Sequence, residues 1–383
     1  MPSSIRKALD ELPDTLDDTY ERILQNIPKQ KWQHAQRLFQ CMVAAIRPLH
    51  VVELAEIFAI GFGPNVSHDL VEDWRPPNAE EAVLSACSTL ITVIDDGGSK
   101  IVQFSHFSVK EYLTSDRLET SNVVNIRKFY ISLEPAHTTL ARACLTVLLQ
   151  LDGKARLAAF PLAHYAARNW VDHAKFENVA SQVRGGMEEL FHPMKPHLRT
   201  WIGMHNVDKL NQAIDGCPSI QLYYAVICGF GGLSKHLIIT YALDVNARTK
   251  FERTPLHVAS ICGHTDVAQA LLDCGAEIDA LDIHKQTPLH LASSNGRAKV
   301  VQLLLEHGAA LDVQSSIQNT PLFLASLNGH FESVQLLLDH GADMKIRCES
   351  SWTPFQIATR WGRHDIVQLL LDHGAEVEEV QRR

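Results

Sequence analysis

From about residue 218 onward, apolar and polar positions recur with a period of 33 residues. Thr-Pro-Leu-His begins at 254 and again at 287, and the variants Thr-Pro-Leu-Phe and Thr-Pro-Phe-Gln begin at 320 and 353. The same period carries a glycine nine residues after each threonine, followed by a leucine run and a Gly-Ala pair. Two short apolar segments on either side of a glycine predict a pair of helices in every period. Because one helix pair cannot bury its leucines alone, the pairs are expected to stack.

The threonine, proline and glycine of each period have predictable roles. The threonine is expected to cap the first helix, and the proline to occupy its first turn, where a missing N–H costs nothing. The glycine permits a left-handed turn into the second helix. A weaker copy over about 218–250 contains Leu222-Tyr-Tyr-Ala, which matches Leu256-His-Val-Ala, but it lacks the Thr-Pro pair. This copy is expected to cap the start of the stack.

This pattern resembles the ankyrin repeat, and the resemblance covers residues 218–383 as one degenerate capping repeat followed by four further repeats. The resemblance implies an α-solenoid with β-hairpin tips. It also implies that the tips and a concave helical surface bind a protein partner.

The chain departs from the family pattern at the hairpin tips and in the last repeat. Ankyrin hairpins usually carry glycine two residues before Thr-Pro, and these places hold Glu252, Lys285, Gln318 and Ser351. A non-glycine residue at positive φ costs roughly 1 kcal/mol, so we expect these tips to relax into other turns. The last repeat keeps an apolar leucine run at 369–371 instead of a polar outer face. We therefore expect its helix pair to be loose, or the natural chain to continue beyond it.

The N-terminal third has a different pattern, in which helices precede two strands. Apolar spacing predicts helices over about 12–27, 31–46, 51–59 and 79–89. The segments Ile91-Thr-Val-Ile and Ile101-Val-Gln-Phe flank Asp96-Gly97-Gly98, which predicts a β-hairpin. Helices followed by a two-stranded wing predict a winged-helix-like domain in residues 1–118. Residues 119–217 are expected to form a helical spacer, so the fold as a whole is mostly α.

The order of these elements resembles the winged-helix segment that follows the nucleotide-binding domain of fungal NACHT proteins. The resemblance rests on Leu12-Pro-x-Thr-Leu-Asp-x-Thr-Tyr-Glu, on Arg47-Pro-Leu, and on Phe-Ser-His-Phe-Ser-Val-Lys-Glu-Tyr-Leu at 104–113. Ala136-His-Thr-Thr-Leu-Ala and Pro161-Leu-Ala-His-Tyr-Ala are similar to the helical spacer of the same proteins. Together with the repeats, these motifs imply the sensor half of a NACHT–ankyrin signalling protein.

A nucleotide-driven switch needs a phosphate loop of the form GxxxxGK[ST], and this sequence contains none. The chain therefore resembles the part of such a protein that lies after the nucleotide-binding domain. A fragment of a nucleotide-switched signalling ATPase is the alternative hypothesis. In related ATPases a histidine just after the wing contacts the bound diphosphate, and His106 occupies the matching place. His106 would sense nucleotide only if a NACHT domain were supplied, and otherwise it is a core or capping histidine.

Composition and charge narrow the remaining classes of function. The chain has 35 Lys and Arg against 44 Asp and Glu, a formal charge of −9, which is a poor match for a phosphate backbone. The candidate recognition helix carries Glu80 and Glu81, and residues 76–99 contain no Lys or Arg. A winged-helix DNA-binding regulator is therefore only a minor alternative, and no nucleic-acid partner is expected.

The cysteines and histidines do not form a recognisable catalytic or metal-binding motif. The eight cysteines are scattered without a CxxC pair, and no HExxH occurs among the 20 histidines, eight of which follow the repeat. We expect no catalytic residues, no cofactor and no metal. The longest nearly apolar stretch, 222–233, is too short to span a bilayer, and residues 1–14 lack an apolar core, so we expect no secretory signal. These features predict an intracellular, cytoplasmic protein without a membrane partner.

A protein partner is expected at the repeat positions that the stack constrains least, the hairpin tips and the ends of the first helices. Exposed apolar, arginine and tryptophan side chains at such places are typical of protein interfaces. For Ile261 and Leu327, packing inside the groove is an equally good interpretation. The sequence thus predicts a non-enzymatic recognition or scaffold module. The candidate residues are Phe251, His284, Ile317 and Glu349 at the tips, and Ile261, Leu327, Asn328, Arg360 and Trp361 at the helix ends.

Overall fold

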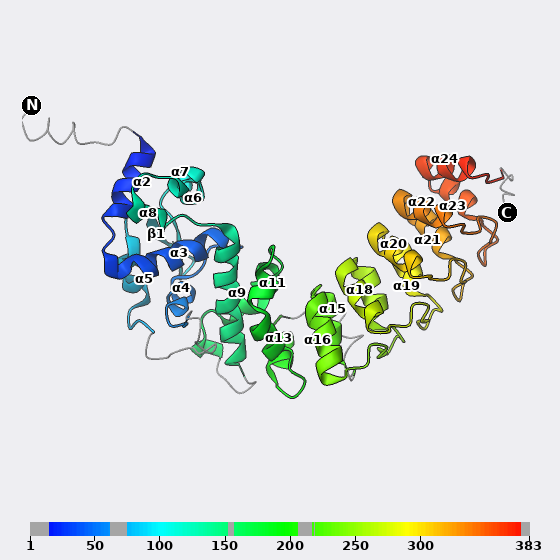
Figure 1. Ribbon diagram of the computed structural model, residues 1–383, viewed down its shortest axis with the longest axis horizontal. Helices are drawn as coiled ribbons and strands as arrows, with labels where there is room; N and C mark the ends of the chain where they lie inside the picture. Colours follow the sequence, from blue (N-terminus) through cyan, green and yellow to red (C-terminus); the bar gives the residue numbers. More distant parts are fainter. Residues whose placement is uncertain (1–14, 62–74, 152–156, 206–216, 218, 377–383) are drawn as a thin grey trace, which may run out of the picture. The chain divides into compact units, whose positions relative to one another are not determined.

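The computed structural model divides the chain into two compact units, Met1–Asn206 and Val207–Arg383 (Figure 1). Each unit has its own hydrophobic core. Within the described residues, no helix is both long and apolar enough to cross a membrane. The residues that the structure describes are 15–61, 75–151, 157–205, 217 and 219–376.

The N-terminal part of the first unit is a winged helix. A two-residue Gly97-Gly98 turn joins the two antiparallel strands, which pair from Ile91 with Phe104 to Asp96 with Ser99. Leu38, Phe39, Leu54 and Val102 are buried in its core. The predicted hairpin is confirmed. The elements are α2 (Leu16–Gln25), η1 (Lys29–Lys31), α3 (Trp32–Ala44), α4 (Val51–Ile57), α5 (Ala79–Cys87), β1 (Ile91–Asp96) and β2 (Ser99–Phe104).

The start of the first helix differs from the prediction because of its cap. Thr15 forms a capping box with Asp18, in which the threonine hydroxyl accepts the Asp18 amide and the Asp18 carboxylate accepts the Thr15 amide. The helix therefore begins at Leu16. Residues 12–14 of the predicted helix lie outside the described residues.

Short helices around one long helix complete the first unit. The long helix α9 (Leu133–Leu149) packs against α3 and α10 (Ala163–Ala174), and its residues from Ala143 to Leu148 are all buried. Trp170 and Trp201 meet edge to face within this helical layer, with ring centroids 5.5 Å apart. The other elements are α6 (Phe107–Leu113), α7 (Asp116–Glu119), α8 (Val124–Arg127), η3 (Leu157–Ala159), α11 (Val179–Gln182), α12 (Arg184–Leu190) and α13 (His197–His205).

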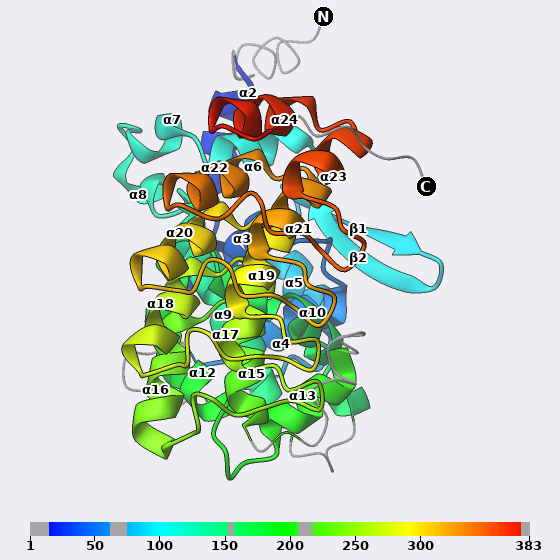
Figure 2. The same cartoon turned by 90° about the vertical axis from the view of Figure 1, so that its right-hand side faces the viewer.

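The second unit is a stack of helix pairs, as the 33-residue period predicts. Figure 2 shows the second helices α16, α18, α20 and α22 in one column beside the first helices. Each of the four Thr-Pro threonines lies at the N-cap of a first helix, and proline occupies the first turn. The pairs are α15 (Ile220–Ile227) and α16 (Gly231–Tyr241), α17 (Pro255–Cys262) and α18 (Thr265–Asp273), α19 (Pro288–Ser294) and α20 (Ala298–Glu306), α21 (Pro321–Asn328) and α22 (Phe331–Asp339), and α23 (Pro354–Arg360) and α24 (His364–Asp372).

The expectation that the hairpin tips relax into other turns is wrong. Glu252, Lys285, Gln318 and Ser351 all keep a left-handed φ, between 55° and 63°. Hydrogen bonds close each tip around them: in the second tip the Lys285 amide donates to the Asp282 carbonyl at 2.8 Å, and the Asp282 amide donates to the Gln286 carbonyl at 3.0 Å. The stack repeats this pair of bonds in every tip. Two such bonds, at roughly 1 kcal/mol each, offset the cost of the strained residue that they enclose.

Candidate functional site

Buried histidines connect the first repeats to one another. In α17 and α19, His257 and His290 accept the backbone amide of their capping threonine at Nδ1, which leaves Nε2 as the proton-bearing nitrogen. Each Nε2 then donates to a carbonyl of the next repeat, that of Gln286 or Asn319, at 3.0 Å. Burial lowers the pKa of His257 to about 4 and also lowers that of His290, so both rings are neutral at pH 7. These two histidines are structural.

The third repeat replaces this histidine with Phe323, and the change creates an apolar cluster. Phe323 packs with Leu324, Cys348 and Ile357, all of them buried. Leu327 and Trp352 are half-buried and pack against the same cluster. Because phenylalanine cannot donate to the next repeat, aromatic and aliphatic contacts take the place of the histidine bridge.

An open groove of about 490 Å³ lies over this cluster. Ile317 and Glu349, from two neighbouring tips, line it together with Trp352 and with Arg360 at the end of α23. The guanidinium carbon of Arg360 lies 5.2 Å from the centre of the Trp352 ring, a cation–π contact. The groove thus combines an apolar floor with one exposed cation and one exposed carboxylate, a combination suited to holding part of a protein chain.

Of the nine candidate residues, the groove brings Ile317, Glu349 and Arg360 together, with Leu327 packed against its floor. The other five do not line it. Phe251 is 38% exposed at the first tip and His284 is exposed at the second. Ile261 is half-buried and its carbonyl accepts the Arg297 guanidinium. Asn328 donates to the carbonyl of Ser294 at 3.0 Å, so its amide joins two repeats. Trp361 is 60% exposed in the turn after α23.

Trp352 is one of the groove residues that the sequence predictions missed, together with Asn319, Phe323, Cys348, Ser350 and Ile357. It stands directly before the fourth Thr-Pro, where the earlier repeats have the polar residues Arg253, Gln286 and Asn319. That substitution, together with the loss of histidine at Phe323, is the sequence signal that could have located the groove. The two positions lie 29 residues apart, on adjacent repeats, and meet only in the folded stack.

His106 caps a helix in the winged-helix unit. Its Nδ1 accepts the backbone amide of Ser108 at 3.3 Å and lies 2.6 Å from the Ser108 hydroxyl, which also meets the Tyr20 hydroxyl at 2.6 Å. Because Nδ1 is an acceptor, the neutral ring carries its proton on Nε2. The exposed ring lies tilted against the Phe107 ring, with the two centres 4.3 Å apart, and its Nε2–H is a suitable donor for an anionic oxygen.

The Arg47-Pro-Leu motif also has a structural role. Arg47 binds the buried carboxylate of Glu53 through two nitrogens, at 2.6 and 2.9 Å, and the backbone amide of His50 donates to the same carboxylate at 2.8 Å. This bidentate pair fixes the start of α4. The arginine also lies over the Tyr165 ring, 5.0 Å from its centre.

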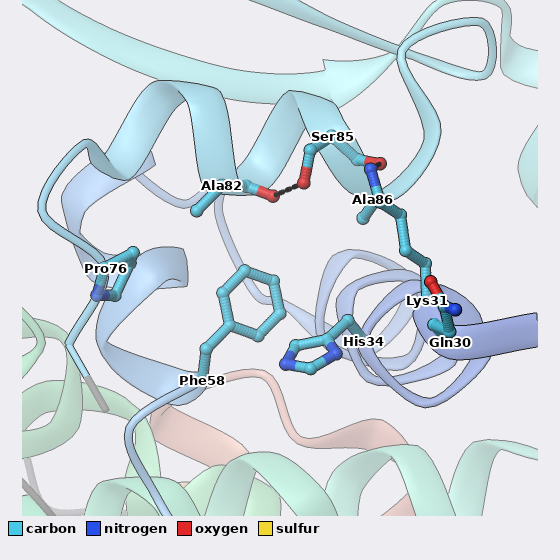
Figure 3. Close-up of a pocket in the computed structure, with 8 residues that line it drawn as sticks. All are labelled: Gln30, Lys31, His34, Phe58, Pro76, Ala82, Ser85 and Ala86. Atoms are coloured by element: carbon cyan, nitrogen blue, oxygen red, sulfur yellow. Dashed lines mark hydrogen bonds between the residues drawn. The ribbon is translucent and has the colours of Figure 1, made fainter. Parts of the chain in front are cut away.

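A second hollow, of about 280 Å³, lies between α3, α4 and α5 in the winged helix (Figure 3). The rings of Phe58 and His34 lie side by side there, with their centres 5.3 Å apart, and Lys31 donates to the carbonyl of Ser85 at 2.9 Å. Burial lowers the pKa of His34. In the part of the chain that the structure describes, no group of three His, Cys, Asp or Glu side chains is placed to hold a metal ion.

The face of the winged helix that would approach DNA is acidic. Glu80 and Glu81 lie in the first turn of α5, the candidate recognition helix. Glu80 forms an ion pair with Lys100 of the wing at 2.5 Å. This pair neutralises a cation that could otherwise bind a DNA phosphate.

Comparison with known proteins matches both parts of the chain. Residues 222–315 and 310–381 match the model for ankyrin repeats in three copies, and residues 20–125 match the GPI inositol-deacylase, winged helix domain. The azaphilone pigments biosynthesis cluster protein L of Monascus ruber is 32% identical over 297 residues, 70% of this chain and 61% of that protein. The human protein fem-1 homolog C is 38% identical over 98 residues, 25% of this chain and 15% of that protein.

This chain therefore spans less than two thirds of the length of these relatives. Ankyrin repeats are non-catalytic and are typical of protein–protein interaction. The chain carries ankyrin repeats together with a GPI-inositol-deacylase-type winged helix domain, as in fungal NACHT–ankyrin proteins.

Proposed function

We propose that this chain is a non-enzymatic recognition module whose ankyrin stack binds a protein partner in the groove around Trp352. Arg360, exposed over that tryptophan, is the observation that carries the proposal, because arginine and tryptophan dominate interface hot spots. The proposed organisation is a winged helix in 1–118, a helical spacer in 119–217 and the repeats in 218–383. In a NACHT–ankyrin protein such a chain would form the sensor half. The proposed localisation is intracellular and cytoplasmic.

The geometry at His106 supports the non-enzymatic part of the proposal. The Ser108 hydroxyl and His106 Nδ1 lie within hydrogen-bond distance, as a catalytic nucleophile and its base would. The same hydroxyl, however, is also hydrogen-bonded to the Tyr20 hydroxyl, and the same nitrogen also accepts the Ser108 amide. Both groups are therefore engaged in capping α6. If a nucleotide-binding domain were supplied, the Nε2–H of His106 could donate to a bound phosphate, which is the alternative function.

The proposal is tested by capturing binding proteins from a fungal lysate with the full chain and with two groove variants, Arg360→Ala and Ile317→Ala. Each substitution is expected to weaken a true partner by about 1–4 kcal/mol. Gln335→Ala, exposed on the outer helix α22, is the matched control and should leave the partner bound.

Leu337→Ala separates binding from stability. Leu337 is fully buried between repeats, so its truncation should cost about 2–5 kcal/mol of unfolding free energy. Arg360→Ala and Ile317→Ala should leave the circular-dichroism spectrum and the urea midpoint nearly unchanged, because both side chains are exposed. The proposal would be refuted if all variants captured the same proteins as the unmodified chain. It would also be refuted if the unmodified chain captured no protein in greater amount than an unrelated bait does.

A further inference from the structure

The charges of the ankyrin stack are separated between two sides. We call the hairpin tips and the ends of the first helices the groove side, and the second helices with their following loops the outer side. The groove side carries eight Lys and Arg residues and three Asp and Glu residues. The rest of 219–376 carries three Lys and Arg residues and thirteen Asp and Glu residues. The groove-side segments are 248–253, 260–264, 281–286, 293–297, 314–319, 326–330, 347–352 and 359–363.

The groove side is therefore positive on a unit that is acidic overall. One of its three carboxylates, that of Asp282, is buried and pairs with Arg253 at 3.3 Å. This pair removes one charge of each sign, so seven of the eight cations stand against two of the three carboxylates. Tips and helix ends border the same groove, because Ile317 and Glu349 from the tips line it together with Arg360 from α23. A ligand in this groove meets a positive field and an apolar floor at once.

From this arrangement we infer that the partner segment is an acidic peptide with one bulky apolar side chain. The apolar side chain lies on Ile317, Phe323 and Ile357, and a neighbouring carboxylate pairs with the guanidinium of Arg360. This inference rests on the proposed function, since it names the class of partner for the same groove.

Two observations favour a peptide over a nucleic acid. The Arg360 guanidinium already covers the Trp352 ring, at 5.2 Å, so that ring is not an open platform for a stacked base. Glu349 lies at the rim of the groove and would repel a run of phosphates. An isolated carboxylate beside an apolar side chain can instead pair with Arg360 and avoid Glu349.

The inference is tested by selecting random twelve-residue peptides from a phage library on the immobilised full chain. The selected peptides are expected to carry net negative charge and at least one large apolar residue. Arg360→Glu should weaken them by about tenfold or more. Lys299→Glu, the same charge reversal on the exposed face of α20, should change affinity by less than about twofold. Arg360 is exposed, so this comparison does not depend on a folding defect.

Ile317→Asp provides a second variant, with its urea midpoint measured alongside, and it should abolish selection of the apolar residue, because it places a carboxylate where the apolar side chain lies. Selected peptides that are neutral or basic, or acidic peptides insensitive to Arg360→Glu, would overturn the inference while leaving protein recognition intact. Failure to enrich any peptide, with lysate capture also unaffected by the groove variants, would reject the proposed function as well. Binding of a single-stranded oligonucleotide or of phosphatidylserine vesicles that requires Arg360, without peptide binding, would also overturn the inference.

Discussion

At the scale of single residues, the left-handed tips store strain that a substitution can release. Lys285 has a φ of 55°. At this φ the steric strain of a residue with a Cβ atom is roughly 1 kcal/mol or more, and glycine avoids that strain because it has no Cβ. Part of this gain is offset because glycine also makes the unfolded chain more flexible. Lys285→Gly should therefore stabilise the stack by about 0.5–1 kcal/mol in urea unfolding. Gln302→Gly, in the middle of helix α20, should instead destabilise it by about 1 kcal/mol. A loss of stability in Lys285→Gly would show that the tip is not strained.

His173 in the first unit makes stability depend on pH. It is fully buried, its Nδ1 lies 2.9 Å from Nδ1 of His137, and its Nε2 lies 2.8 Å from the Tyr165 hydroxyl. Burial, with a smaller contribution from His137, lowers its pKa to about 3. The unfolded histidine binds a proton below about pH 6.5 and the folded one does not, so stability falls as pH falls from 6.5 toward 3.

We expect His173 to contribute a loss of about 1–2 kcal/mol of unfolding free energy between pH 7.5 and 5. The measurement is urea unfolding followed by tryptophan fluorescence, because Trp170 and Trp201 are buried in the same unit. His173→Gln lowers stability at every pH but should show a shallower dependence between these two values. Equal slopes in the two proteins would exclude His173 as a source of the pH dependence.

At the scale of elements, the last repeat is expected to open most easily. Only Ile366 and Leu370 are buried in α24, whereas five residues are buried in α20. Local opening is easier where fewer apolar side chains are buried. Amide hydrogens in 353–376 should therefore exchange faster than those in 287–340, as measured by mass spectrometry. Equal protection of the two segments would contradict this reading of the burial pattern.

The sequence predicted the elements far better than the groove, for a physical reason. Threonine caps, proline first turns and glycine turns act within one repeat, so the 33-residue period was enough to place the helix pairs. The groove depends on Phe323 and Trp352, which belong to different repeats and meet only after stacking. The left-handed tips were mispredicted because the penalty for one residue was weighed without the hydrogen bonds that close each tip.

At the scale of the whole molecule, the chain should neither bind nor hydrolyse ATP by itself. Binding a triphosphate requires several backbone N–H groups directed at the phosphates and a lysine beside them, and the sequence has no GxxxxGK[ST] loop to supply them. The closest resemblance, Gly97-Gly98-Ser99-Lys100, is the turn of the β1–β2 hairpin, and Lys100 pairs there with Glu80. His106 could donate a single hydrogen bond, which is too little to hold a nucleotide alone.

Isothermal calorimetry with magnesium and ATP should therefore show no saturable heat at micromolar protein, and no phosphate should be released. The His106→Ala variant should give the same trace as the unmodified chain, because the proposed contact requires a phosphate held by another domain. Micromolar binding that His106→Ala abolishes would mean that the winged helix itself holds the nucleotide. In that case the chain would be part of the switch rather than only its recognition module.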